Sequence, residues 1–393
     1  MVDFLIIFIL LFGLNQIIYT SLKKKFTFFD KSLMNKLYWY HLFFFVVYAI
    51  YASYNSSDSG RYYNMGNNYG DSWMLLYEPG TKFVGFVATP LVQLGFSYMS
   101  LMLLFSWMGY IGFVFAYLFF KENISINVIV FKRFDLLTLL LFLPNMHFWT
   151  VSLGKGSIIF MGLMMFTQAI KYPQKRLFTL ILGVFLVYMV RPHVMLFMLV
   201  GVMLGLLTGK DKMKIGLKIF ILLVSLGFLY QASSTILHVA NLENSQNVVD
   251  DFGQFSDQRS IGLSEKAGSG ISMSSYPLPL KFFTFWFRPL FVDSPNILGL
   301  FSSLENLLYL LLFIKICNRR FIKFLRKSPY MVKMSFIVFL LTSFAMTFVM
   351  SNLGIIMRQK SMVMYFGFFV IYYFLANEKW LKEQKIMSVS KVS

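Results

Sequence analysis

The chain has 393 residues, of which 58% are hydrophobic and only 13% are charged, and its mean hydropathy is +0.66. Soluble domains carry roughly 25% charged residues, so this composition excludes an ordinary soluble protein and indicates a polytopic membrane protein. The net charge of +19 would suit a nucleic-acid-binding protein, but Lys and Arg fall mostly in short segments between apolar runs, which is typical of cytoplasmic loops and argues against a nucleic-acid partner.

Apolar runs of about 17–25 residues, the length that crosses a bilayer as a helix, recur along almost the whole chain. We therefore expect an all-α transmembrane helix bundle of about eleven spans that forms a single integral-membrane domain over residues 1–393. The expected spans are residues 2–20, 37–54, 91–120, 134–150, 156–171, 177–190, 193–208, 215–237, 296–316, 331–351 and 360–377. Residues 2–20 lack a basic leader and a cleavage site, so we expect a retained first span. The segments Lys82–Pro90 and Lys281–Pro295 indicate interfacial or re-entrant structure.

Basic residues divide unequally between the two sides of this arrangement. The segments on one side, namely residues 21–36, 121–133, 171–176, 209–218, 315–333 and 378–393, hold 26 of the 36 Lys and Arg residues. Because basic loops favour the cytoplasmic side, we expect the N-terminus outside and the C-terminus inside.

A polar stretch, Tyr51–Trp73, follows the second expected span and interleaves Tyr and Trp with Asn, Ser, Asp and Arg. Aromatic rings can stack on the faces of sugar rings while amides and carboxylates pair with sugar hydroxyls, so this composition suits saccharide recognition. It suits an ordinary interfacial loop equally well, because Tyr and Trp gather at that depth in any membrane protein.

The apolar run from Leu177 to Thr208 is interrupted by Arg191-Pro192-His193. Proline removes a backbone donor and disfavours helix at the preceding residue. One continuous helix would also move every later basic loop to the outer side. We therefore expect two short helices joined by a tight turn at the outer surface. Further along, residues at about 238–280 are expected to form a long extracytoplasmic loop, either a functional lid or a partly disordered segment.

Four cations on the expected outer side share one local setting, at or near the end of a span and beside Gly, Pro, Ser or Asn. They are Lys155, Arg191, Arg288 and Arg358. Snorkelling of a long side chain into the interface explains any one of them. Four in the same setting favour a common site, and guanidinium forks suit phosphate oxygens. We expect them to bind the diphosphate of a lipid-linked substrate.

Several catalytic motifs are missing from the chain. There is no P-loop, no HExxH, no GxSxG and no cluster of histidine and cysteine, so neither ATP-driven transport nor metal catalysis has sequence support. His147 and His193 are expected near the outer rim, where a histidine can accept a proton but is more often a hydrogen-bonded interface residue.

Five short motifs lie in this layout. They are DSGRYY (Asp58–Tyr63), SLGK (Ser152–Lys155), the RPH turn, Arg288-Pro289 before SSLEN (Ser302–Asn306), and NLGIIMRQK (Asn352–Lys360). In combination and order they resemble bacterial oligosaccharide repeat-unit polymerases, the Wzy/EpsG-like group. The chain departs from that group in one respect: many such polymerases have two long arginine-bearing outer loops, whereas here one of the two is the RPH turn.

The resemblance implies a metal-independent membrane glycosyltransferase that needs no cofactor and builds O-antigen, capsule or exopolysaccharide in the multi-pass bacterial inner membrane. Such enzymes move a growing glycan from undecaprenyl diphosphate onto a sugar hydroxyl of the next lipid-linked unit. The expected partners are the undecaprenyl-diphosphate-linked glycan and the bilayer, with a chain-length regulator as a further candidate. The catalytic candidates are Arg191, Arg288, His193 and Asp58, and the substrate-binding candidates are Lys155, Arg358, Lys360, Arg61 and Tyr62.

Other readings of the sequence remain open. A lipid-phosphate-dependent glycosyltransferase of the GT-C type would carry acidic residues in its first outer loop, where Asp58 and Asp71 lie thirteen positions apart. A flippase for lipid-linked oligosaccharides would need cations accessible from both leaflets and often two pseudo-repeated halves, neither of which the sequence indicates. A non-enzymatic component of an envelope assembly complex would leave the outer cations without a joint role.

Overall fold

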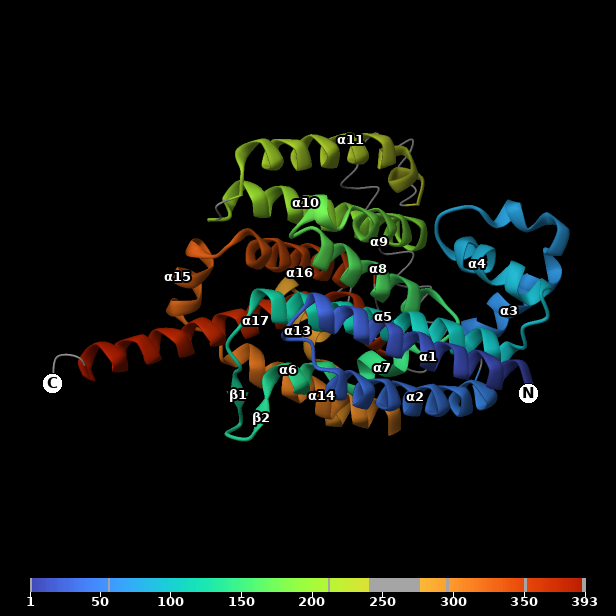
Figure 1. Cartoon of the computed structure of the whole chain (residues 1–393), viewed down its shortest axis with the longest axis horizontal. Helices are drawn as coiled ribbons and strands as arrows, with labels where there is room; N and C mark the ends of the chain where they lie inside the picture. The colour runs from blue at the N-terminus through green and yellow to red at the C-terminus, as the bar shows by residue number, and fades with distance from the viewer. Residues whose placement is uncertain are drawn as a thin grey trace. The chain divides into compact units, whose positions relative to one another are not determined.

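A computed structural model describes residues 2–55, 57–210, 213–239, 276–294, 297–349 and 352–390. These residues are almost entirely helical, which confirms the expected all-α class (Figure 1). Strand occurs in the described part only as a short antiparallel hairpin between β1 (Ile129–Val130) and β2 (Phe134–Asp135). The expected loop at about 238–280 lies outside the described residues apart from its two ends.

The chain divides into two compact units, the first made of Met1–Ser125 and Leu137–Arg191 and the second of Ile126–Leu136 and Pro192–Ser393. The expectation of a single domain over the whole chain stays a prediction.

The first unit is built around a long buried helix. Its helices are α1 (Val2–Lys25), α2 (Lys31–Tyr54), α3 (Asp58–Asn68), the 3₁₀ helix η1 (Gly70–Leu76), α4 (Thr81–Gln93), α5 (Tyr98–Asn123), α6 (Leu136–Leu141, which starts at the boundary), α7 (Pro144–Thr150), α8 (Lys155–Ala169), η2 (Pro173–Lys175) and α9 (Leu177–Val190). Helix α5 contacts α1, α2, α7 and α8, and α8 in turn contacts α9. The N-terminus of α5 is capped by Ser97, whose side chain accepts a hydrogen bond from the Ser100 backbone. Because α5 is apolar around its whole circumference, it forms the core.

Small residues let these helices approach closely. A Cβ atom at Gly109 of α5 would overlap the carbonyl oxygen of Thr150, and one at Gly183 of α9 would press on the backbone of α8. Close backbone approach at glycine is the usual way in which membrane helices gain contact area without a hydrophobic driving force.

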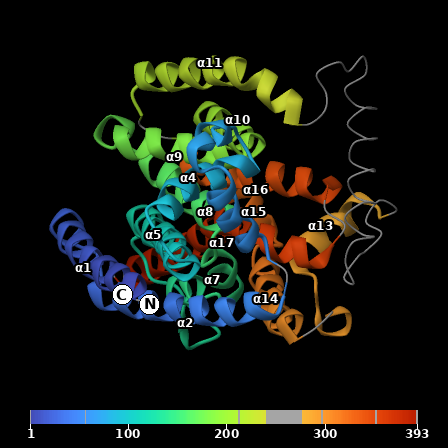
Figure 2. The same cartoon turned by 90° about the vertical axis from the view of Figure 1, so that its right-hand side faces the viewer.

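The second unit contains the remaining helices: α10 (Pro192–Thr208), α11 (Ile215–Val239), α13 (Leu278–Phe287), the 3₁₀ helix η4 (Phe291–Asp293), α14 (Ile297–Ile314), α15 (Arg319–Lys327), α16 (Tyr330–Val349) and α17 (Leu353–Ser390). Helix α10 packs against α16, where Gly201 and Gly205 meet Val338 and Met334. Helix α11 lies beside α10 in both views (Figures 1 and 2). Helix α17 contacts both α14 and α16.

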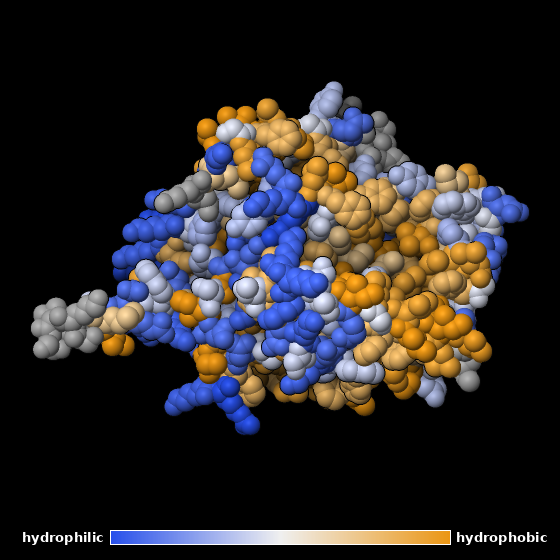
Figure 3. All heavy atoms as spheres, in the orientation of Figure 1, coloured by the Kyte–Doolittle hydropathy of each residue, from blue (hydrophilic) through white to orange (hydrophobic). Residues whose placement is uncertain are grey.

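Among the described residues, four helices are long and apolar enough to cross a membrane: α1, α5, Ile215–Ser233 of α11 and Tyr330–Phe348 of α16. A bent pair, Gly299–Ile314 with Arg319–Lys327, would make a fifth. On α1 and α11 the apolar side chains are exposed, as at Ile9 (66%) and Leu223 (63%), which suits contact with lipid (Figure 3). The count of eleven spans and the sides of the termini stay predictions.

Helices lie near all the expected span positions, but two spans are divided. The expected span 91–120 becomes the end of α4 and then α5, because Gly95 turns the chain with a positive φ of 85°. The expected span 134–150 becomes α6 and α7, with Pro144 starting the second helix. The run Leu177–Thr208 breaks at Arg191, as predicted from Pro192.

Candidate functional site

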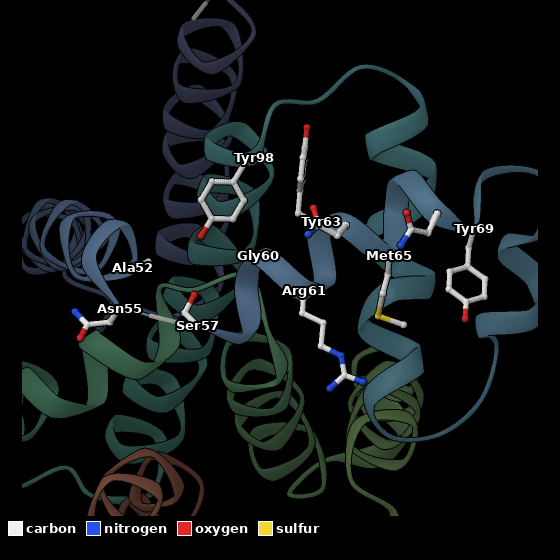
Figure 4. Close-up of a pocket in the computed structure, with 11 residues that line it drawn as sticks. Ala52, Asn55, Ser57, Gly60, Arg61, Tyr63, Met65, Tyr69 and Tyr98 are labelled. Carbon is white, nitrogen blue, oxygen red and sulfur yellow. The ribbon is translucent and has the colours of Figure 1, made fainter. Parts of the chain in front are cut away.

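An open cavity of about 870 Å³ lies in the first unit beside α3 (Figure 4). Its lining combines amides, tyrosines, an arginine and small residues: Ala52, Asn55, Ser57, Gly60, Arg61, Tyr63, Asn64, Met65, Asn68, Tyr69 and Tyr98. The end of α2, the open face of α3 and the start of α5 therefore contribute to one surface.

Helix α3 is held against α4 by one face, which leaves its polar face open. Tyr62 is 2% exposed, and Gly66 sits so close to Val92 that a Cβ atom there would overlap it. The Gln93 side chain donates a hydrogen bond of 2.9 Å to the carbonyl of Gly66. On the other side of the helix, Arg61, Asn64 and Asn68 are exposed.

Hydrogen bonds orient two aromatic rings at this cavity. The Tyr63 hydroxyl donates to the carbonyl of Phe96 at 3.2 Å, and the Tyr98 hydroxyl shares a 2.6 Å hydrogen bond with Ser59. The two rings meet edge to face with their centroids 5.7 Å apart. Arg61 extends from α3 on the side away from Tyr63 in Figure 4.

This arrangement offers several kinds of interaction with a ligand. Each asparagine supplies two donors and an acceptor, and tyrosine supplies an apolar ring with a hydroxyl. The guanidinium of Arg61 can bind an oxyanion through two parallel hydrogen bonds. A polyhydroxylated ligand that carries an anionic group matches this surface.

The structure separates the residues predicted from DSGRYY. Arg61 lines the cavity, Tyr62 is buried, and Asp58 is exposed in the first turn of α3, next to the lining residue Ser57. Sequence reasoning missed Tyr63, Asn64 and other lining residues. The signal was present, because 57, 60, 61, 64, 65 and 68 follow the spacing of one helical face.

Two of the four cations that are expected on the outer side lie near one short segment of the first unit. Lys155 begins α8 and donates a 2.8 Å hydrogen bond to the hydroxyl of Thr81. The backbone N–H of the neighbouring residue, Gly80, donates a 2.7 Å hydrogen bond to the carbonyl of Met189. Met189 lies two residues before Arg191, which caps the C-terminal end of α9. The start of α8 and the end of α9 are thereby tied to the same turn.

In the second unit, the Arg288-Pro289 turn is fastened by buried side chains. Lys360, fully buried, donates hydrogen bonds to the carbonyl of Arg288 at 2.9 Å and to the side chain of Asn306 at 2.5 Å. Asn306 donates in turn to the carbonyl of Pro289 at 2.7 Å. The motifs around Arg288, Asn306 and Lys360 therefore meet. Lys360 acts on the turn that carries Arg288, which makes it a positioning residue in this structure.

The Arg288 side chain is paired within its own turn. Its guanidinium forms an ion pair with Asp293, and 21% of its side chain is exposed. Burial lowers the pKa of Arg288, but the hydrogen bonds to Asp293 and Tyr276 and the charges of these two groups together outweigh it, so the pKa lies above its ordinary value. Arg288 is therefore a permanent cation at a partly open position.

Two further candidates lie on other helices of the second unit. His193 is the second residue of α10, and Arg358 lies in the second turn of α17; both are half-buried. Lys155 and Arg191 belong to the first unit, whereas Arg288 and Arg358 belong to the second. That the four form one diphosphate site stays a prediction.

The histidine His147 is fully buried and does not reach a rim. Its Nδ1 lies 2.8 Å from Nδ1 of His41, and its Nε2 bonds to the carbonyl of Leu141 at 2.8 Å. Its ring stacks on Phe113 with 4.0 Å between centroids. These contacts indicate a structural role in the core of the first unit.

Within the described residues, no three His, Cys, Asp or Glu side chains are grouped so that they could hold a metal ion. Comparison of the chain with protein-family models, with curated proteins and with solved structures finds no match.

Proposed function

We propose that the chain is a glycosyltransferase that polymerises undecaprenyl-diphosphate-linked oligosaccharide repeat units at the extracytoplasmic face of the bacterial inner membrane. The observation that carries the proposal is the cavity beside α3, where asparagines, tyrosines and Arg61 share one open surface. Its volume of about 870 Å³ is sufficient for an oligosaccharide of a few sugar rings. Helices apolar enough to cross a membrane support access to a lipid-linked substrate.

In this proposal the cavity binds the saccharide of one lipid-linked unit. The tyrosine rings stack on sugar faces, while Asn55, Asn64 and Asn68 exchange hydrogen bonds with hydroxyls. A site that hydrogen-bonds hydroxyls rejects analogues that lack them, because its own polar groups are then left without partners. The asparagines would therefore set sugar specificity.

The reaction follows from the substrate chemistry. The oxygen of an acceptor sugar hydroxyl bonds to the anomeric carbon of the donor glycan while the bond from that carbon to the diphosphate oxygen breaks. The electron pair leaves with undecaprenyl diphosphate, and the hydroxyl proton passes to a base, for which Asp58 and His193 are the candidates. No nucleotide is needed, because the diphosphate is already an activated leaving group.

Cations would stabilise this reaction in its transition state. Negative charge grows on the diphosphate as the carbon–oxygen bond breaks, so fixed guanidinium and ammonium groups bind the transition state more tightly than the ground state. Arg191 and Arg288 are the proposed cations for the leaving diphosphate, with Lys155, Arg358 and Arg61 as supporting ones. Lys360 supports Arg288 through the Arg288-Pro289 turn.

The test is deletion of the gene in its native host, followed by complementation and electrophoresis of the surface polysaccharide. Arg61→Ala should give single repeat units without polymer. Arg133→Ala removes the same charge from an exposed position outside the cavity and should restore the full ladder. Loss of every outward-facing saccharide repeat unit would favour a flippase. Saccharide repeat units that lack one sugar would favour a glycosyltransferase of the GT-C type.

A further inference from the structure

Helix α15 (Arg319–Lys327) concentrates positive charge on one face. Five of its nine residues are basic and none is acidic. Its other face is aromatic: the Phe321 ring lies 6.1 Å from Phe336 of α16 and 5.4 Å from Phe374 of α17. The aromatic face is thus packed within the second unit, and hydrophilic atoms cover the region of α15 in Figure 3.

The direction of α15 relative to α14 suggests where it sits in a membrane. The two helices meet at a bend of 80°, and Asn318 caps the start of α15 by accepting a hydrogen bond of 3.0 Å from the Phe321 backbone. If α14 crosses the bilayer, a helix bent by 80° lies close to the plane of the membrane surface. A short basic amphipathic helix in that plane is the usual form of an interfacial segment.

A groove of about 350 Å³ lies beside α15 and is lined by both cationic and apolar side chains. Its lining residues are Thr208, Ile322, Leu325, Arg326, Lys333, Phe336 and Ile337. Lys333 is anchored there by a hydrogen bond from its ammonium group to the carbonyl of Thr208. Arg326 is exposed, and no acidic residue is among the lining residues.

We propose that this groove binds one anionic phospholipid of the leaflet in which α15 lies. The phosphate would contact Arg326 and Lys333, and an acyl chain would lie over Phe336 and Ile337. Free phosphate would pair with the cations but leave the apolar side chains exposed to water. A zwitterionic lipid would cover the apolar side chains but bring no net negative charge to the cations. An anionic lipid satisfies both halves of the groove.

The test uses the purified full-length chain in detergent, with bound lipid counted by native mass spectrometry during titration. The probes are phosphatidylglycerol, phosphatidylcholine of the same chain length, and inorganic phosphate as a competitor. The variant is Arg326→Gln, and its matched control is Arg319→Gln, which removes the same charge from an exposed position of α15 outside the groove.

The proposal predicts that wild type retains phosphatidylglycerol over phosphatidylcholine and that Arg326→Gln weakens retention of phosphatidylglycerol about fivefold. Arg319→Gln should change it less than twofold, and millimolar phosphate should not displace the lipid. Equal loss in both variants, equal retention of the two lipids, or displacement by phosphate would overturn it. These readouts do not depend on glycosyl transfer.

Discussion

The ammonium group of Lys360 donates a 2.5 Å hydrogen bond to the side-chain oxygen of Asn306, and both residues are buried. Asn306 and Lys360 are 54 positions apart in the sequence, and each also bonds to a carbonyl of the Arg288-Pro289 turn. The backbone of the Arg288-Pro289 turn is therefore held by two residues that are distant from it in the sequence.

Lys360→Met should weaken both stability and activity. Methionine fills most of the volume but leaves the oxygens of Asn306 and Arg288 without their donor, at a cost of about 1–3 kcal/mol for each buried group. The measurement is the midpoint of thermal unfolding of the purified protein, together with the length of polymer in the complemented host. Lys382→Met, at an exposed position of the same helix, should leave both unchanged. Equal effects of the two substitutions would show that the buried contacts do not hold the turn.

Asn64→Ala and Asn68→Ala should weaken saccharide binding without unfolding α3. Both side chains are exposed and line the cavity, so each substitution removes ligand hydrogen bonds, each of which contributes about 0.5–1.5 kcal/mol. We expect the apparent KM for the lipid-linked substrate to rise about two- to tenfold for each. Asn67→Ala is the matched control, because Asn67 is exposed on the same helix but does not line the cavity. An Asn67→Ala variant as defective as the other two would contradict the assignment of the cavity.

Gly109→Ala should destabilise the first unit. The added methyl group would overlap the carbonyl oxygen of Thr150, so α5 and α7 would have to separate, at a cost of about 1–3 kcal/mol. Gly13→Ala adds the same group where nothing lies within 4 Å and should leave the unfolding midpoint unchanged or slightly raised. The comparison is thermal unfolding of the two variants in one detergent. A midpoint for Gly109→Ala equal to that of wild type would contradict the close packing of α5 on α7.

The positions of most helices can be predicted from the sequence, because apolar runs and prolines determine helix length and helix ends through neighbouring residues alone. Pro192 correctly predicted the break at Arg191. Other features needed tertiary contacts: α15 falls in a segment that charge counting alone treats as a loop, and its helix is stabilised by Phe321 against Phe336 and Phe374. The mean hydropathy of such a segment averages its basic and aromatic residues, so it does not reveal that they lie on opposite faces of a helix.

The candidate site was predictable only in part. The polar stretch after α2 suited saccharide recognition and an ordinary interfacial loop equally well. The helical period of α3 separates buried Tyr62 from exposed Arg61. The contact of Lys360 with Arg288 could not be foreseen, because no local pattern links positions 72 residues apart. Burial of His147 depends likewise on His41, which is 106 positions away.

Reconstitution of the purified chain tests metal-independent polymerisation of lipid-diphosphate-linked saccharide most directly. The protein in phospholipid vesicles is given the host's own undecaprenyl-diphosphate-linked repeat unit, with a chelator present and no nucleotide. We predict products of two or more repeat units, with one undecaprenyl diphosphate released for each bond formed, from wild type and Arg133→Ala but not from Arg61→Ala. Substrate that stays entirely monomeric with folded wild-type protein, or polymer of normal length from Arg61→Ala, would contradict the account.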